Sequence, residues 1–219
     1  IQALTIAQVQ VLTTDQIAQL TSTQIQQLTV GQLAKLSTAQ LESIETVDIP
    51  ALTKTQIQAL TTAQLHTLTA DQMAAITSTQ IQAMTTAQLG ALNLGQGTLT
   101  DQQLQGLTTS QLQSFTTTQI QSLSDAQIQL LSETQIQALK VTQVQALTST
   151  QVEALTTTQI GALTTAQIAK LETTDLAVLS EAQLQKLSDA QIKALTTTQI
   201  VALTSDQMVS LTSTQIQDL

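Results

Sequence analysis

The sequence predicts an all-α solenoid, a superhelix of very short helices with one helix in each eight-residue repeat. Three observations support this fold class. The octad Leu-Thr-x-x-Gln-Ile-x-x recurs 27 times in succession through the 219 residues, its Thr and Gln form a helix-start signal, and its charges are distributed as a short helix prefers. A fixed short period is typical of an array in which each repeat contacts only its neighbours.

The octad positions are named a to h, with Leu at a, Thr at b, Gln at e and Ile at f. Position a is aliphatic in every octad except at Phe115, and position f is aliphatic except at Gly97. One continuous helix would rotate this apolar pair by about 80° per octad, and one extended strand would place a and f on opposite faces. The chain is therefore expected to change direction once in every octad.

Position b is expected to begin the helix. Thr or Ser followed three residues later by Gln is a capping box, in which the hydroxyl accepts the N3 amide and Gln reaches back to the N-cap amide. Positions a and f then fall at the two partners of a hydrophobic staple. Twelve of the 15 acidic residues lie at b to e and four of the six lysines at g or h, which suits the helix dipole.

A β-solenoid is the main structural alternative, because Thr, Ile and Val favour strands. Its tight corners usually need Gly, Asn or Asp, whereas this chain has six Gly and a single Asn.

A helix of fewer than eight residues is far too short to be stable alone. Stability is therefore expected from stacking against neighbouring octads, adjacent coils or sister chains.

The repeat loses its phase once. The spacing between successive a positions falls to seven residues between Leu92 and Leu99. We expect an octad array over residues 1–92, a phase break or hinge at 93–98, and a second array over 99–219. The scar of a deletion explains the same break equally well.

Two octads replace both residues of the capping box. Glu45 and Glu172 stand at b, with Asp48 and Asp175 three residues later at e. We expect an alternative cap in these octads, with the hydroxyl of the residue after each Glu taking the place of the missing one. A calcium-type ligand loop is absent around both pairs.

The composition excludes several classes of function. A net charge of −9 and a pI near 4.2 disfavour binding to nucleic acid. The absence of Cys excludes a disulfide, a thiolate nucleophile and a Cys-ligated metal. No apolar run reaches the ~20 residues of a membrane span. The chain begins and ends in mid-octad, as expected for part of a longer array.

The sequence offers no catalytic, cofactor-binding or metal-binding residue, and we expect neither an enzyme nor a cofactor. His66 is the single histidine, lies at the solvated g position and has no second His or Cys to complete a metal site. The Ser and Thr hydroxyls lack a neighbouring base, and no Gly-rich phosphate loop is present.

The octads, clean from Leu147 to Leu171, resemble the long Thr/Gln-rich octapeptide repeat tracts of very large bacterial secreted or surface proteins, often adhesin-like. This resemblance implies an extracellular or cell-surface stalk or spacer. We therefore expect a non-enzymatic rod or fibre segment that packs against other copies of itself or neighbouring repeats of a longer chain, and that assembles into filaments. The alternatives are an interaction scaffold or adhesin repeat that binds a peptide, glycan or surface, and, third, ice binding through ranks of Thr.

Overall fold

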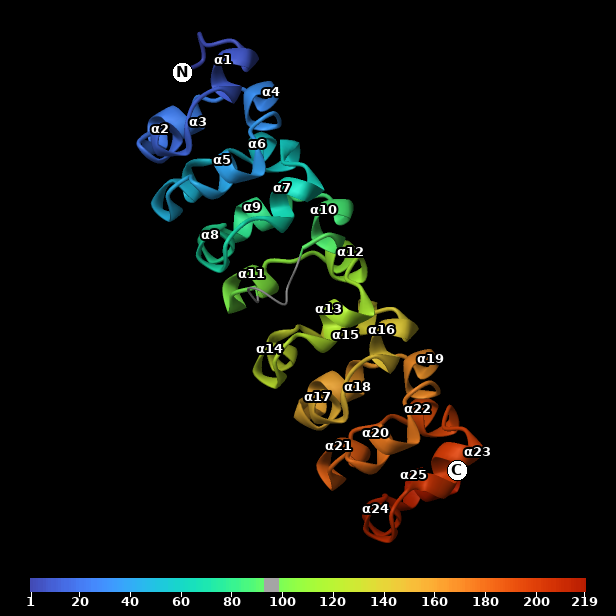
Figure 1. The fold of residues 1–219 in the computed structure, drawn as a ribbon. Helices are drawn as coiled ribbons and strands as arrows, with labels where there is room; N and C mark the ends of the chain where they lie inside the picture. The colour runs from blue at the N-terminus through green and yellow to red at the C-terminus, as the bar shows by residue number, and fades with distance from the viewer. Residues whose placement is uncertain (93–98) are drawn as a thin grey trace. The chain divides into compact units, whose positions relative to one another are not determined.

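The computed structural model describes residues 1–92 and 99–219, and their regular secondary structure consists of short helices with no strand among them. The prediction of an all-α solenoid with one short helix per octad is confirmed (Figure 1). The chain divides into two compact units, Ile1–Ser114 and Phe115–Leu219, which we describe separately. The expected division at residues 93–98 lies outside the described residues and stays a prediction.

The described helices of the first unit are α1 (Ile6–Gln10), α2 (Thr14–Ala18), α3 (Ser22–Gln26), α4 (Val30–Leu33), α5 (Thr38–Glu42), the 3-10 helix η1 (Thr46–Ala51), α6 (Lys54–Ala59), α7 (Thr62–His66), α8 (Ala70–Ala75), α9 (Ser78–Ala83), α10 (Thr86–Gly90), α11 (Asp101–Gln105) and α12 (Thr109–Gln113).

The helices of the second unit are α13 (Thr117–Gln121), α14 (Asp125–Leu130), α15 (Glu133–Ala138), α16 (Val141–Gln145), α17 (Ser149–Ala154), α18 (Thr157–Ala162), α19 (Thr165–Ile168), α20 (Thr173–Ala177), α21 (Glu181–Gln185), α22 (Asp189–Lys193), α23 (Thr197–Ala202), α24 (Ser205–Ser210) and α25 (Ser213–Asp218).

The chain turns between helices through extended residues at a and b. Between α6 and α7, Leu60 has φ −61° and ψ 129°, and Thr61 has φ −71° and ψ 158°. Both conformations are open to any L-residue, and no residue in the described ranges has a positive φ. These corners therefore need no Gly, which explains how a chain with so few glycines bends once per octad.

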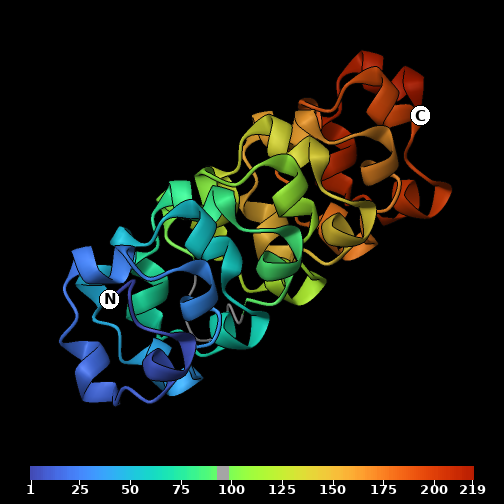
Figure 2. The same ribbon diagram turned by 90° about the horizontal axis from the view of Figure 1, so that it is seen from above.

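Helices three octads apart pack against each other within each unit, for example α6 against α9 in the first and α14 against α17 in the second. Figure 2 shows the successive coils that this packing produces. Side chains also bond to backbone groups 28 to 31 residues away, as described below. One coil of the solenoid therefore takes between three and four octads.

The a and f side chains form the core of each unit, as the octad predicts. The f residues Ile57 and Ile160 have no exposed surface, and Phe115 at a is buried like the aliphatic residues that it replaces. Burial weakens in the first and last octads, where only one neighbouring coil is present, so Ile216 is 45% exposed. The apolar residues thus point into a common seam inside the coils.

Candidate functional site

The recurring polar feature is the Thr–Gln pair that begins each helix. In α18 the Thr156 amide donates to Gln159 Oε1 at 2.9 Å, and the Gln159 amide donates to the Thr156 hydroxyl at 3.1 Å. This reciprocal pair satisfies two of the amides that a helix start leaves unbonded. The predicted capping box is therefore confirmed.

The glutamine of this pair also donates hydrogen bonds to the backbone of the preceding coil. Gln159 is 2% exposed, and its Nε2 donates to the carbonyl oxygens of Ile128 at 2.8 Å and Leu131 at 2.7 Å. These acceptors are the f residue and the next a residue of an earlier coil, 31 and 28 residues before the amide. One buried side chain thus caps its own helix with its oxygen and joins two coils with its nitrogen.

We name this arrangement the glutamine ladder. Bonds from Nε2 to carbonyl oxygens 31 and 28 residues earlier recur at Gln32, Gln40, Gln56, Gln64, Gln72, Gln80, Gln88, Gln151, Gln159, Gln167, Gln191, Gln199, Gln207 and Gln215. Because Gln has both an acceptor and two donors, a single residue type can fill both roles.

The ladder continues on both sides of the phase break in the first unit. Gln103 donates to the carbonyl oxygens of Met73 at 2.8 Å and Ile76 at 2.5 Å, 30 and 27 residues earlier. The offset is one residue shorter because one residue is missing from the intervening octad, yet the acceptors still belong to f and a. Gln103 therefore bonds to the same octad positions as the other ladder glutamines, although the repeat before it is one residue shorter.

The first three octads show what the ladder requires. Gln8, Gln16 and Gln24 form capping boxes, but their side chains are exposed and their Nε2 atoms have no acceptor in the described chain. At the other end, no side-chain amide of the described residues donates to the carbonyl oxygens of Ile200 and Leu203. One end therefore presents glutamine donors without an acceptor, and the other presents carbonyl oxygens at the ladder positions without a side-chain donor.

A second set of bonds runs on the exposed side, from position g to position h about 25 residues later. Gln58 Nε2 donates to the Ala83 carbonyl oxygen at 2.8 Å, and Gln129 Nε2 donates to that of Ala154 at 2.9 Å. Position g is solvated as expected, but it also links neighbouring coils.

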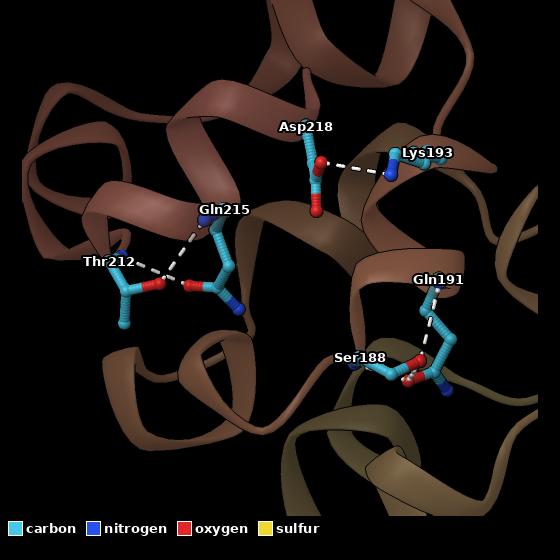
Figure 3. Close-up of polar contacts among 6 residues, drawn as sticks. All are labelled: Ser188, Gln191, Lys193, Thr212, Gln215 and Asp218. Carbon is cyan, nitrogen blue, oxygen red and sulfur yellow. Dashed lines mark hydrogen bonds and ion pairs between the residues drawn. The ribbon is translucent and has the colours of Figure 1, made fainter.

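The ion pair between Lys193 and Asp218 uses the same g-to-h spacing, with 2.9 Å between Lys193 Nζ and Asp218 Oδ1 (Figure 3). The hydrogen bond and charge of Asp218 raise the pKa of Lys193. The Lys193 side chain remains 61% exposed, so solvent screens the pair. Figure 3 also shows the capping pairs of α22 and α25, Ser188 with Gln191 and Thr212 with Gln215.

The alternative cap expected at the two Glu/Asp octads is wrong. Glu45 and Glu172 remain at the N-cap position, Thr46 and Thr173 are the first helical residues, and neither octad has a side-chain cap bond. A side chain can cap only from the extended N-cap position, and both threonines lie one residue too far along.

The two aspartates instead bond to serines of the preceding coil. Ser149 Oγ donates to Asp175 Oδ1 at 2.8 Å, and Ser22 Oγ donates to Asp48 Oδ1. Each serine is at position c, 26 residues before its aspartate. Both aspartates are buried, with 5% of Asp48 and 3% of Asp175 exposed. A buried Ser–Asp contact thus stands where the ladder would use Gln.

A lysine at position b leaves half of the capping box. The Lys140 amide still donates to Gln143 Oε1 at 2.9 Å, but no hydroxyl is present to accept the Gln143 amide. α16 nevertheless begins at Val141. The glutamine side of the box is therefore enough to set this helix start within a stacked array.

Residues with possible binding chemistry do not gather in the described ranges. His66 lies exposed in the last turn of α7, and no group of three His, Cys, Asp or Glu side chains there could hold a metal ion. Glu42 and Glu45 line an open groove beside η1 together with Thr46 and Gln72. Within residues 1–92 and 99–219, no helix has the length and apolar character that a membrane crossing requires.

The fold and the ladder define the class of protein: a helical tandem-repeat solenoid. The model of the ALTTAQ repeat family matches residues 30–62, 41–78, 134–165 and 168–205, which together cover more than half of the chain. The chain therefore belongs to the ALTTAQ repeat family. No curated protein matches the sequence.

Proposed function

We propose that this chain is a non-enzymatic structural segment, a rod or fibre part of an extracellular or cell-surface protein, built to be extended by adding octads. The observation that carries this proposal is the glutamine ladder, because the same buried side chain serves the same two structural roles in octad after octad. The recurring glutamine side chains join neighbouring coils and do not gather into one site.

The ladder donors and acceptors that have no ladder partner at the two ends support extension of the array by further octads. The exposed amides of Gln8, Gln16 and Gln24 can donate to carbonyl oxygens such as those of Ile200 and Leu203. Hydrogen bonds in the same register would form with further octads of one chain or between copies of the chain. Repeat arrays of this kind gain stability from each new interface between neighbours, so longer arrays and filaments are the expected working state.

Placement outside the cell rests on the resemblance of the octads to repeat tracts of secreted and surface proteins. The test is to treat intact producing cells with a protease and then detect the octads by antibody. Loss of the signal from intact cells supports surface exposure. A signal that disappears only after the cells are permeabilised contradicts it.

The rod itself is tested by changing the number of octads in the full chain. Three or six copied octads, from the 24-residue block of 147–170, are inserted after residue 170. Small-angle scattering should show the maximum dimension rising linearly with octad number, while the cross-sectional radius stays constant. A maximum dimension that does not grow with added octads would overturn the rod proposal.

Assembly through the ends has its own test. Sedimentation at increasing protein concentration should show end-to-end association, and replacing Gln8, Gln16 and Gln24 together by Ala should weaken it about tenfold or more, since each buried amide bond is worth about 1 kcal/mol. The matched control replaces the exposed Gln26, Gln121 and Gln137. Association that is equally strong in both triple variants would contradict a role for the ladder donors.

A further inference from the structure

Asp175 carries a buried oxygen that the fold leaves without a partner. The residue is 3% exposed, its Oδ1 accepts the Ser149 hydroxyl at 2.8 Å, and its Oδ2 has no hydrogen-bond partner. An unbonded buried polar atom costs about 1–3 kcal/mol. No other buried side-chain N or O atom in the described residues lacks a hydrogen-bond partner. This cost suggests that the oxygen has a function.

The ladder register identifies the backbone groups that belong to this position. Glutamines at e donate to carbonyl oxygens 31 and 28 residues earlier, and the bond at 28 residues is among the shortest, 2.7 Å for Gln159 to Leu131. For Asp175 the equivalent residues are Val144 and Leu147, and no side-chain amide in the described chain donates to either carbonyl. The shorter aspartate thus replaces a donor with an acceptor.

The chemistry of a carboxyl group offers one way to restore the donor. An ionised carboxylate only accepts hydrogen bonds, whereas a protonated carboxyl donates one. We propose that Asp175 is a proton-operated latch: when protonated, it donates from Oδ2 to the Leu147 carbonyl oxygen and joins the two coils as Gln does elsewhere. When ionised, it leaves only acceptors at this contact and loosens the coils.

The electrostatic surroundings favour the protonated form. Burial raises the pKa of Asp175 and is the largest effect, the Ser149 hydroxyl lowers it, the charge of Glu172 raises it, and a backbone hydrogen bond from Glu172 lowers it. The net result is a raised pKa. Among the elements packed against α20, α17 carries Glu153 and α23 carries no charged residue.

The sign of the effect follows from linkage. A carboxyl whose pKa is higher in the folded chain than in the unfolded chain adds stability that is fully present below the unfolded pKa. This contribution is lost as the pH rises through the folded pKa. The latch therefore closes as the pH falls through the folded pKa of Asp175 and opens above that pKa.

The same exchange occurs in the first unit, where Glu45, Asp48 and Ser22 repeat the pattern of Glu172, Asp175 and Ser149. The carbonyl groups at the ladder register are there those of Ile17 and Leu20. The Glu/Asp replacement and the Ser–Asp bond therefore recur once in each unit, whereas among the described side chains the unbonded buried oxygen is found at Asp175.

The direct experiment is a carbon-13 NMR titration of the Asp175 carboxyl in the full chain. We expect a midpoint above 3.9, the ordinary value for Asp. Thermal unfolding of Asp175→Asn, which has the same size and a permanent donor, provides the second readout. The melting temperature of this variant should exceed that of the wild type at pH 7, and the difference should shrink at pH 5.

The exposed Asp206→Asn is the matched control and should show a difference from the wild type that does not change between these pH values. If Asp175→Asn does not fold, Asp175→Gln supplies the donor in the form that the other octads use. A carboxyl midpoint at or below 3.9, or a melting difference independent of pH, would overturn the latch.

Discussion

The side-chain nitrogen of Gln159 lies 2.7 Å from the carbonyl oxygen of Leu131, a residue one coil earlier in the solenoid. The same amide group accepts the Thr156 backbone N–H through its oxygen. Local helix initiation and long-range stacking are therefore coupled in one buried group. An octad helix that could not persist alone in water is fixed at its start by the residue that also attaches it to its neighbour.

The hydroxyl of the capping box should contribute measurably to stability. Thr61→Ala removes the acceptor of the Gln64 amide, a bond of 3.2 Å, and should lower the free energy of unfolding by about 1 kcal/mol. Thr61→Ser should retain most of the stability. Thr62→Ala, one residue later and exposed, is the control and should change the free energy by less than about 0.5 kcal/mol in chemical denaturation. Equal losses for Thr61→Ala and Thr62→Ala would contradict the role of the cap.

Two glycines should respond oppositely to Ala. A Cβ at Gly161 would lie 3.5 Å from the Lys186 carbonyl oxygen, an ordinary contact, so Gly161→Ala should stabilise α18 by about 0.5–1 kcal/mol. A Cβ at Gly106 would lie 3.1 Å from the Ser78 Cβ and 3.3 Å from the Gln102 carbonyl oxygen. Gly106→Ala should therefore bring no gain or a loss. The pair is compared by thermal unfolding, and a larger gain at Gly106 would show that the neighbouring coils pack differently.

Restoring the ladder at the first Glu/Asp octad should stabilise the first unit. Asp48→Gln restores the amide donor that the ladder uses at the carbonyl oxygens of Ile17 and Leu20, and should add about 1 kcal/mol to the free energy of unfolding. Adding Glu45→Thr completes the capping box and should add about another 1 kcal/mol. A fall in stability with the double variant would mean that the Ser22–Asp48 contact is worth more than a ladder bond.

Octad sequence alone predicts the helix starts and the apolar seam, because the interactions that set them are local. Thr156 and Gln159 are three residues apart, and the a and f residues share a seam wherever the chain bends once per octad. The coil period is not local. It depends on the angle that each Leu–Thr corner makes, so the partner of Gln159 at Leu131 could not be identified from spacing.

One signal of the ladder was nevertheless present in the sequence. A capping box accepts Glu as readily as Gln, and a helix start favours acidic residues, yet position e holds Gln or Asp in every octad and never Glu. The excess of Gln indicates that the donor Nε2 is required. The burial of Asp48 and Asp175 had no comparable signal, because the serines that contact them lie 26 residues away.

The central claim is that the glutamine at e holds one coil to the next, and two alanine variants test it most directly. Gln159→Ala leaves the carbonyl oxygens of Ile128 and Leu131 without their donor, whereas Gln16→Ala removes only a capping bond from an exposed side chain. In chemical denaturation, Gln159→Ala should lose about 2–5 kcal/mol and Gln16→Ala about 1 kcal/mol or less. Equal losses at the two positions would show that the glutamines only cap their own helices.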